Sequence, residues 1–428
     1  MTAVPKDPIR KSGAAIDPAF GLKVATFYGA LFVVYGMHVP YTPVWLSWRG
    51  LSAAEISAVM AAPFFLRVFI TPAAAVYADR TGSHRRMLIA LAWLSFAAVL
   101  ALSQAPPFWP ILVLTIALII ANSTIMPLTE TIAVAGVRRA GLDYGRMRLW
   151  GSLSFVAASF AGGLAVEHYG GGSGIWLVAA GCLMTSMAAH YLPRDAVERK
   201  APQAGATRRS KFDVRELKVL LSSGAFLTFL VAAGCAQAAH ATLLAFGTLI
   251  WQDQGLSGGW IGTLWAAGVM AEVALFWGSG ALLSRTGPVL LLLVAAAVSC
   301  LRWVAMGFAP GLSVLLPLQL LHGITYGASH IAAIHFIHRF VPHDVQGSAQ
   351  ALYSTVAAGI AMGAATLMAG HMYARSGAQS YFAMGGIALI SLAAALLLYW
   401  RWRDPAVGAS PVSDPEPLPE PEPLEAQV

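Results

Sequence analysis

A duplicated pattern of short motifs constrains the fold of this chain more than any other feature. The tripeptide Gly-Leu-Ser occurs at positions 50–52 and 255–257, and Arg-Thr-Gly occurs at positions 80–82 and 285–287. Both pairs are separated by the same offset of 205 residues. Two chance matches would not share one offset, so the sequence indicates two related halves of roughly 200 residues each.

Long apolar runs fill both halves. Hydrophobic residues make up 57% of the chain and charged residues only 11%, whereas about a quarter of the residues in soluble domains are charged. We therefore predict an all-α membrane protein with twelve transmembrane helices in two pseudo-symmetric six-helix bundles. The predicted helices start near Leu22, Ala53, Met87, Phe108, Met147, Ile175, Leu221, Gly258, Pro288, Gly311, Gly347 and Tyr381.

The basic residues predict the orientation of the chain. Of the 27 lysines and arginines, 23 lie at the termini or in connections on one side of the predicted helices. By the positive-inside rule this side is cytoplasmic, which makes the chain a multi-pass protein of the cell (inner) membrane with both termini in the cytoplasm. The net charge of +7 is spread over loops and not over one soluble surface, which argues against a nucleic-acid partner.

Composition divides the chain into five segments. We expect a cytoplasmic amino-terminal segment at 1–21, a six-helix bundle at 22–192, a basic cytoplasmic linker at 193–220 and a second six-helix bundle at 221–403. Residues 404–428 are acidic and rich in proline, a composition that predicts a disordered cytoplasmic tail.

Two charged residues fall near the middle of apolar runs, at equivalent positions of the two halves. Arg67 and Glu272 are related by the same offset of 205 residues, and each lies about 20 Å from either end of its predicted helix. Charged side chains are rare at this depth in a membrane and are typical of functional sites. Glu130 and Glu272 are the only acids placed well inside predicted helices. A static buried ion pair that locks helices together is the alternative interpretation.

The connection at 79–86 carries a recognisable motif. It reads Asp-Arg-Thr-Gly-Ser-His-Arg-Arg and resembles the G-x-x-x-D-R-x-G-R-R loop of the major facilitator superfamily, with Ala75 in place of the first glycine. The resemblance implies that Asp79, Arg80, Gly82 and the duplicate Arg285 form gating loops. An Asp-Arg pair at a helix end can hold neighbouring helices together in one gate state, although a tight glycine turn flanked by solvated cations remains the alternative.

A closer resemblance begins at 142–152, which reads Leu-Asp-Tyr-Gly-Arg-Met-Arg-Leu-Trp-Gly-Ser. Together with Gln-Ala-Ala-His at 237–240, Leu-Arg-Trp at 301–303, His322 and His330, it resembles the phenylpropionate permease family, relatives of lactose permease. The resemblance implies the major facilitator fold and proton-coupled import of a small organic solute by alternating access. Aromatic carboxylic acids such as phenylpropionate-like compounds are the best-known substrates of that family.

In the fold that the resemblance implies, the first, fourth, seventh and tenth helices line a central cavity. These helices carry polar residues at helical spacing here. The candidate substrate-binding residues are Tyr35, His38, Arg67, Asn122, Glu130, Arg148, Gln237, His240, Tyr326 and His330. Of these, Glu130 and Arg148 can meet, and the resemblance to lactose permease implies that this pair contacts the substrate, with an ordinary orientation charge as the alternative for Arg148. The aromatic residues Tyr28, Tyr41, Trp265 and Trp277 are further candidates for stacking on a substrate ring. Scattered hydrogen bonds between helices are the alternative for any one of these residues.

Resemblance to lactose permease also implies a proton-coupling group, consisting of Glu272, Arg302 and His322. Burial disfavours the charged form of a carboxyl group and a nearby arginine favours it, so a buried glutamate whose cation partner is taken by substrate can carry a proton. The acid that lactose permease has one turn after this histidine is Thr325 here. Glu272 is therefore the better candidate for the proton donor.

Other functions remain open. Export of amphipathic small molecules is one alternative, and it predicts that overexpression makes cells resistant to such compounds. Sugar or nucleoside proton symport is another and differs in the substrate. A non-transporting membrane receptor is a third, and it predicts ligand binding without flux. An enzyme is not expected, because no Ser or Cys nucleophile is paired with a base in the sequence. The histidines and the three cysteines show no metal-ligand spacing, so we expect no metal and no cofactor. The expected partners are a small-molecule substrate, protons and the lipid bilayer, and the expected state is a monomer.

Overall fold

The computed structural model describes residues 18–106, 108–193, 214–343 and 345–402. This described part of the chain is helical and contains no β-strand. The predicted tail at 404–428, residues 1–17 of the predicted amino-terminal segment and residues 194–213 of the predicted linker lie outside the described residues.

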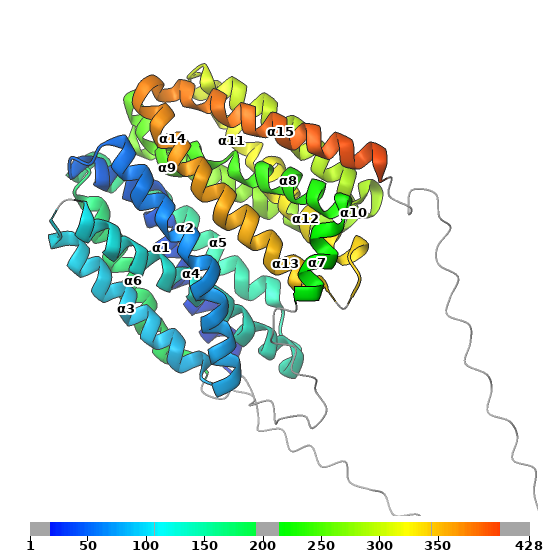
Figure 1. Cartoon of the computed structure of the whole chain (residues 1–428). Coiled ribbons are helices and arrows are strands. Elements are labelled where there is room, and N and C mark those ends of the chain that lie inside the picture. Colours follow the sequence, from blue (N-terminus) through cyan, green and yellow to red (C-terminus); the bar gives the residue numbers. More distant parts are fainter. Residues whose placement is uncertain (1–17, 107, 194–213, 344, 403–428) are drawn as a thin grey trace, which may run out of the picture.

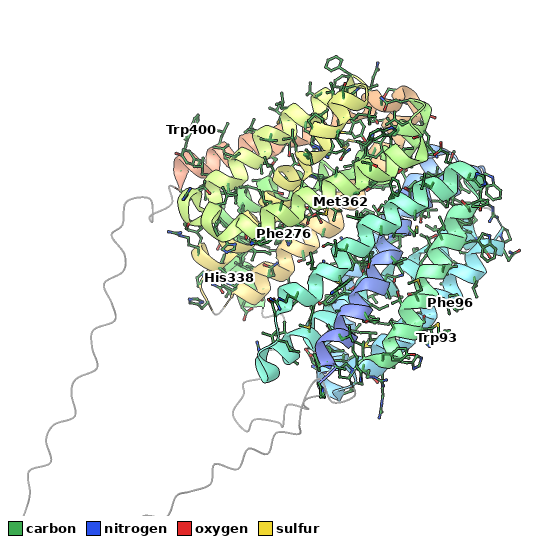
Figure 2. All side chains as sticks on the ribbon, turned by 180° about the vertical axis from the view of Figure 1, so that it is seen from behind. Trp93, Phe96, Phe276, His338, Met362 and Trp400 are labelled. Atoms are coloured by element: carbon green, nitrogen blue, oxygen red, sulfur yellow. The ribbon has the colours of Figure 1, made fainter. Side chains whose placement is uncertain are left out.

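Six long helices form the amino-terminal half (Figure 1), and Figure 2 shows both halves from behind. They are α1 (Phe20–Trp48), α2 (Ala53–Thr81), α3 (His84–Gln104), α4 (Trp109–Ala140), α5 (Tyr144–Tyr169) and α6 (Ser173–Tyr191). Side-chain caps define two of the starts. Ser52 and Glu55 bond each other's backbone N–H groups at the start of α2, which is a reciprocal capping box. Asp143 caps α5 by accepting a hydrogen bond from the backbone N–H of Arg146.

The carboxy-terminal half has more interruptions. It contains the short α7 (Val214–Ser222), α8 (Gly224–Ala238), α9 (Ala241–Asp253), α10 (Gly258–Gly307), α11 (Leu312–Leu320), the π-turn η1 (Gly323–Ala328), α12 (Ser329–Phe340), α13 (Gln346–Tyr353), the π-turn η2 (Ser354–Ala361), α14 (Met362–Ser376), the short η3 (Gly377–Gln379) and α15 (Ser380–Arg401). Helix α10 is two membrane helices that meet at Gly287, where the backbone leaves the helical conformation. The other spans are α8 with α9, α11 to α12, α13 to α14, and α15, so the twelve predicted membrane helices are confirmed.

The duplicated motifs mark equivalent turns of the two halves. Gly50 and Gly255 have φ angles of 81° and 77°, and Gly82 and Gly287 have φ angles of 62° and 70°. Glycine adopts this left-handed region without the steric penalty that a Cβ atom brings. The two tripeptides therefore recur where each half needs a positive φ before and after its second helix.

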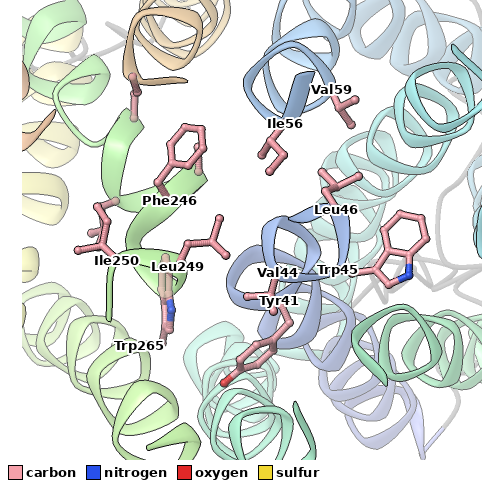
Figure 3. Packing of buried hydrophobic residues seen from close by; sticks show 14 of the residues in the cluster. Tyr41, Val44, Trp45, Leu46, Ile56, Val59, Phe246, Leu249, Ile250 and Trp265 are labelled. Carbon is pink, nitrogen blue, oxygen red and sulfur yellow. The ribbon is translucent and has the colours of Figure 1, made fainter. Parts of the chain in front are cut away.

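The buried apolar residues form one cluster that both halves share and two clusters that lie within single halves. The shared cluster brings together Tyr41, Val44 and Leu46 of α1, Ile56 of α2, Phe246, Leu249 and Ile250 of α9, and Trp265 of α10 (Figure 3). The separate clusters surround Phe27 and Ile132 in one half and Phe229 and Phe336 in the other. We call the end that bears Gly50 and Gly255 the joined end, and the end that bears Gly82 and Gly287 the separate end.

Glycines allow the two halves to touch backbone to backbone at the joined end. A Cβ atom at Gly163 of α5 would strike the carbonyl of Gly258 in α10, and one at Gly262 would lie 2.6 Å from the Phe160 Cα atom. A second contact joins α14 to α2, where a Cβ atom at Gly370 would strike the Ser57 side chain. Further along this contact, Gly359 and Gly363 lie against Val68 and Phe65 of α2, so that pair of glycines permits close helix packing.

We expect Gly262→Ala to hold the joined end apart, because the added Cβ atom would meet backbone atoms of α5 that cannot rotate away. The measurement is the distance between spin labels at Trp176→Cys and Gln379→Cys, which are exposed positions in opposite halves, in a background without the three native cysteines. Gly280→Ala in the same helix is the control, since its Cβ atom would meet open space. An unchanged distance distribution in the Gly262 variant would contradict this account of the contact.

Candidate functional site

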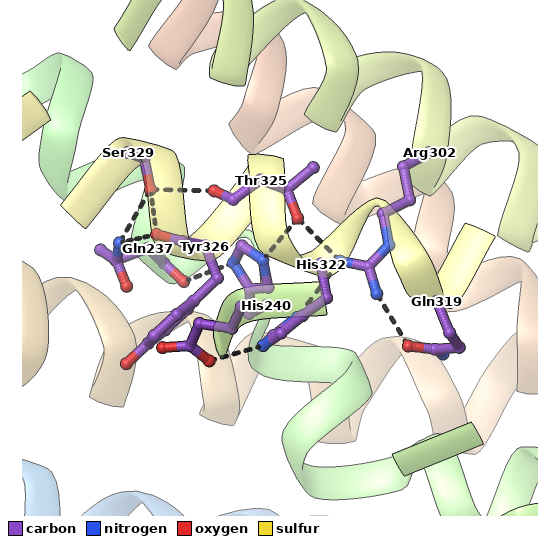
Figure 4. Close-up of polar contacts among 9 residues, drawn as sticks. Gln237, His240, Arg302, Gln319, His322, Thr325, Tyr326 and Ser329 are labelled. Carbon is purple, nitrogen blue, oxygen red and sulfur yellow. Dashed lines mark hydrogen bonds and ion pairs between the residues drawn. The ribbon is translucent and has the colours of Figure 1, made fainter. Parts of the chain in front are cut away.

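A buried arginine lies at the centre of a polar network in the carboxy-terminal half (Figure 4). Arg302 has 0% of its surface exposed. It donates from Nη1 to Thr325 Oγ1 at 2.8 Å and from Nη2 to Gln319 Oε1 at 2.9 Å. Its guanidinium also lies 4.4 Å from the ring centroid of Trp303. Among the described residues, Arg302 forms no salt bridge with an acid, its contacts are with neutral groups, and its Nε atom is buried without a hydrogen-bond partner.

His322 connects this arginine to the predicted acid. Its Nδ1 atom lies 3.4 Å from Arg302 Nη1, and its Nε2 atom lies 3.9 Å from Glu272 Oε2. A guanidinium only donates hydrogen bonds, so Nδ1 must accept, which places the imidazole proton on Nε2, facing the carboxylate. Glu272 and His322 keep 21% and 12% of their side-chain surface exposed. The structure thus brings the three predicted proton-coupling residues into one chain of contacts.

His240 and Thr325 complete the network where two helices are interrupted. His240 lies between α8 and α9, and its Nδ1 atom is 3.1 Å from the carbonyl of Ala236. A carbonyl accepts, so Nδ1 carries the proton and Nε2 accepts from the Thr325 hydroxyl at 3.1 Å. Thr325 lies in the π-turn η1, a local widening of the helix that is frequent at functional sites.

The π-turn also places a stack of rings beside this network. The rings of His322 and Tyr326 are stacked, with centroids 5.2 Å apart and planes 8° apart. His240 meets both rings edge to face, each at 5.4 Å. Gln237 donates to Ser329 Oγ at 2.9 Å, which ties α8 to α12 below the rings. His330, one residue further along α12, is half-buried.

The second predicted pair, Glu130 and Arg148, meets in the amino-terminal half. Arg148 Nε lies 3.8 Å from Glu130 Oε1, a distance too long for a hydrogen bond. The carboxylate instead accepts a hydrogen bond of 2.5 Å from the Tyr144 hydroxyl. The Arg148 guanidinium lies 4.0 Å from the ring centroid of Phe32 and 5.6 Å from that of Tyr28. Arg148 also interacts electrostatically with Glu272 of the other half.

Arg67 bonds the backbone of the opposite half. It donates from Nη2 to the backbone carbonyl of Ala358 in η2 at 2.5 Å, and it lies 4.7 Å from the ring centroid of Phe64. Arg67 and Glu272, which the duplication relates, form no ion pair in the part of the chain that the structure describes. Arg67 joins α2 to the opposite half through the carbonyl of η2.

Other predicted site residues bond within their own half. Tyr35 donates to the Asn122 carbonyl at 3.0 Å, Asn122 donates to the Leu118 carbonyl on its own helix, and His38 bonds Thr42 one turn away. Two aromatic candidates also lie elsewhere. Trp265 is buried in the shared core and donates to Thr248, and Trp277 is 93% exposed. The positions of these residues favour packing over contact with a ligand.

The predicted gating loops form the turns at the separate end. Asp79 accepts a hydrogen bond of 2.8 Å from His84 Nε2, which holds the end of α2 to the start of α3. In the structure, the acid of the predicted Asp-Arg pair, Asp79, bonds a histidine of its own half. Gly82 ends α2 in the left-handed conformation, and Arg285 is exposed on α10.

Three residues of the site were not anticipated from the sequence. Gln319 accepts a hydrogen bond from Arg302, and Tyr144 donates one to Glu130. The guanidinium of Arg148 lies over the ring of Phe32. Gln319 lies three residues before His322, so helical spacing could have identified it. The sequence offers no comparable signal for Tyr144, which approaches Glu130 from another helix.

The sequence is similar to those of known proteins over most of its length. Residues 22–384 match the model of the MFS_1 like family. A probable 3-phenylpropionic acid transporter of Escherichia coli (strain K12) is 31% identical over 372 residues, which cover 86% of this chain and 94% of that protein. The maltose permease of Geobacillus stearothermophilus is 30% identical over 355 residues, which cover 82% of this chain and 86% of that protein.

The fold is also similar to solved structures of transporters. The nucleoside transporter NupG has a TM-score of 0.75 at 16% identity, covering 89% of this chain and 99% of that chain. A bacterial homolog of the human lysosomal transporter Spinster has a TM-score of 0.72 at 14% identity, covering 90% of this chain and 98% of that chain. At these identities the similarity shows the major facilitator fold and nothing about the substrate.

We expect Thr325→Val to destabilise the protein by about 1–3 kcal/mol, because the substitution leaves a buried Arg302 donor without its acceptor. The measurement is thermal unfolding of the purified protein. Thr185→Val is the matched control, since Thr185 is equally buried but bonds only a carbonyl of its own helix. Equal stability of the two variants would show that the Thr325 hydroxyl does not support the network.

Proposed function

We propose a substrate class and a driving ion for this chain, which belongs to the MFS_1 like family and is a membrane transporter. The substrate is a small organic anion, specifically an aromatic carboxylic acid such as a phenylpropionate-like compound. The driving ion is the proton, and the direction is import. The observation that carries the proposal is that Arg148, which lies beside the rings of Phe32 and Tyr28 in one half, interacts electrostatically with Glu272, which lies beside His322 in the other half.

Arg148 is the proposed partner of the substrate carboxylate. Glu130 is bonded by Tyr144 and stands 3.8 Å from Arg148, which leaves donors of the guanidinium available. A planar guanidinium can bind both oxygens of a carboxylate. The rings of Phe32 and Tyr28 beside Arg148, and the stacked Tyr326 and His322 in the opposite half, offer aromatic surface for a substrate ring.

Glu272 is the proposed proton carrier. While ionised, its carboxylate competes with a substrate carboxylate for the charge of Arg148. Protonation removes this competitor, so substrate and proton are expected to bind together. His322 Nε2 lies 3.9 Å from the carboxylate, close enough to interact with its charge, and Arg302 fixes the tautomer of His322 through Nδ1. In this scheme Arg302 is a positioning residue and Glu272 exchanges the proton.

The arrangement of the hydrophobic cores supports alternating access. The positive-inside rule supports an orientation in which the separate end and both termini face the cytoplasm. The halves share a core at the joined end and have separate cores at the other end, which supports a state that is closed to the outside. Rocking of the two halves about the central site would close the cytoplasmic end and open the joined end.

Sugar symport is the second candidate. It is favoured by the maltose permease, whose identity to this chain is 30%, close to the 31% of the phenylpropionic acid transporter. A sugar would use neutral donors and acceptors such as His240 and Gln237, and it would not require Arg148 to lose its interaction with Glu272. The two candidates therefore differ in whether the substrate must carry a negative charge.

We expect Glu272→Gln to abolish accumulation driven by a proton gradient in proteoliposomes while preserving counterflow exchange of substrate. A glutamine keeps the size and the hydrogen-bonding capacity of the side chain but cannot change its charge. Glu55→Gln is the control, because glutamine serves equally well in the capping box of α2. Uptake by the Glu272 variant that still depended on the gradient would rule out this residue as the proton carrier.

We expect 3-phenylpropionate to raise the melting temperature of the purified protein, and the uncharged 3-phenylpropanol, maltose and uridine to have no such effect. Arg148→Lys should weaken binding of the acid about tenfold or more, since a charged hydrogen bond contributes about 1.5–3 kcal/mol. Arg146→Lys is the control, because Arg146 is exposed and pairs with Asp143 at the start of the helix. Stabilisation by maltose instead of the acid would establish the sugar candidate.

A further inference from the structure

The two duplicated helix starts are capped differently. At the start of α2, Ser52 and Glu55 form a capping box within one helix. The equivalent positions at the start of α10, at the shared offset, are Ser257 and Trp260. Ser257 makes no side-chain capping bond, and a tryptophan cannot supply the acceptor that Glu55 supplies. The first turn of α10 therefore lacks the cap that its duplicate possesses.

The missing acceptor comes from the other half of the protein. Glu167, in the last turn of α5, accepts a hydrogen bond of 2.8 Å from the backbone N–H of Gly258, the first residue of α10. A carboxylate at this position also interacts favourably with the positive end of the helix dipole. Gly163 and Gly258 touch backbone to backbone beside this bond, and a Cβ atom at Gly258 would lie 2.9 Å from the Glu167 Cβ atom.

The bond between Glu167 and Gly258 joins the two halves, so opening of the joined end would break it. A cavity of about 280 Å³ between the halves is lined by Glu167, Gly258, Tyr41 and Gln252, among others. Glu167 itself remains exposed, whereas Gly258 is buried. Separation of α5 from α10 would remove the carboxylate from the Gly258 N–H and leave water as its replacement. Helix α2 would keep its own cap throughout, because both members of its capping box belong to the same helix.

We propose that Glu167 is a gate residue of the transport cycle, whose carboxylate caps α10 across the interface while the joined end is closed and releases it when that end opens. The cap favours the closed joined end because it exists only in that state. The duplication explains why one helix start acts in this way and the other does not. This role concerns the gate, and it is independent of the substrate and of the coupling ion.

The test measures the spin-label pair at Trp176→Cys and Gln379→Cys in the full chain without any ligand. Glu167→Ala is expected to raise the ratio of open to closed joined ends by about fivefold, the effect of losing a typical helix cap. Glu167→Gln keeps an oxygen acceptor and loses the charge, so a smaller increase is expected. Thermal unfolding confirms that each variant is folded, and an unchanged ratio in both Glu167 variants would overturn the proposal.

The Trp260→Glu variant tests whether Glu167 acts by capping α10 or only by packing. This substitution gives α10 the Ser-x-x-Glu pattern of α2, so that α10 carries its own cap in both gate states. In this background Glu167→Ala is expected to change the ratio by less than about twofold, because the lost bond has a substitute. An equal shift in the native and Trp260→Glu backgrounds would show that Glu167 acts by some route other than capping. Because no substrate is added, this result does not depend on the proposed transport activity.

Discussion

The burial of one guanidinium determines how the carboxy-terminal half is built. Arg302 is removed from solvent, and its guanidinium contacts Thr325, Gln319, His322 and the face of Trp303, none of which is an acid. The π-turn η1, which contains Thr325, and the interruption at His240 lie beside these contacts. Irregular backbone at membrane depth is tolerated only where it is buried in protein or lines a water-filled cavity. The breaks in these helices therefore lie where buried polar groups bond one another.

Helix α10 links this network to the gate. It starts at Gly258 against Glu167 and carries Glu272 about 20 Å further along. It then turns at Gly287 and returns with Arg302. In the gate that we propose, movement of its first turn away from α5 would act on the same helix that carries Glu272. Arg67 adds a second link, since it bonds the Ala358 carbonyl across the interface.

Sequence patterns anticipated the elements better than the contacts between them. The apolar runs and the repeated glycines located the helices and their turns, because length, hydrophobicity and left-handed turns are local properties. Resemblance grouped Glu272 with His322 and Arg302, and Glu130 with Arg148. It could not anticipate that Arg67 would bond a backbone carbonyl, since every residue has one and the side-chain sequence does not mark it. Nor could it anticipate Tyr144 or Glu167, whose partners depend on the rotation and register of two packed helices.

The hydrogen bonds of the network also bear on which group exchanges a proton. His240 donates from Nδ1 to a carbonyl and accepts at Nε2 from Thr325, which itself accepts from Arg302. A second proton on His240 would make Nε2 a donor, so the Thr325 hydroxyl could no longer donate to it. It would also add a positive charge near the buried guanidinium of Arg302. The same objection applies to Nδ1 of His322, which already faces Arg302. Glu272 has neither obstacle, because it is partly exposed and its protonation removes a charge from the interior of a membrane protein. With threonine at position 325, the carboxylate of Glu272 is therefore the group best placed to carry the proton in the mechanism that we propose.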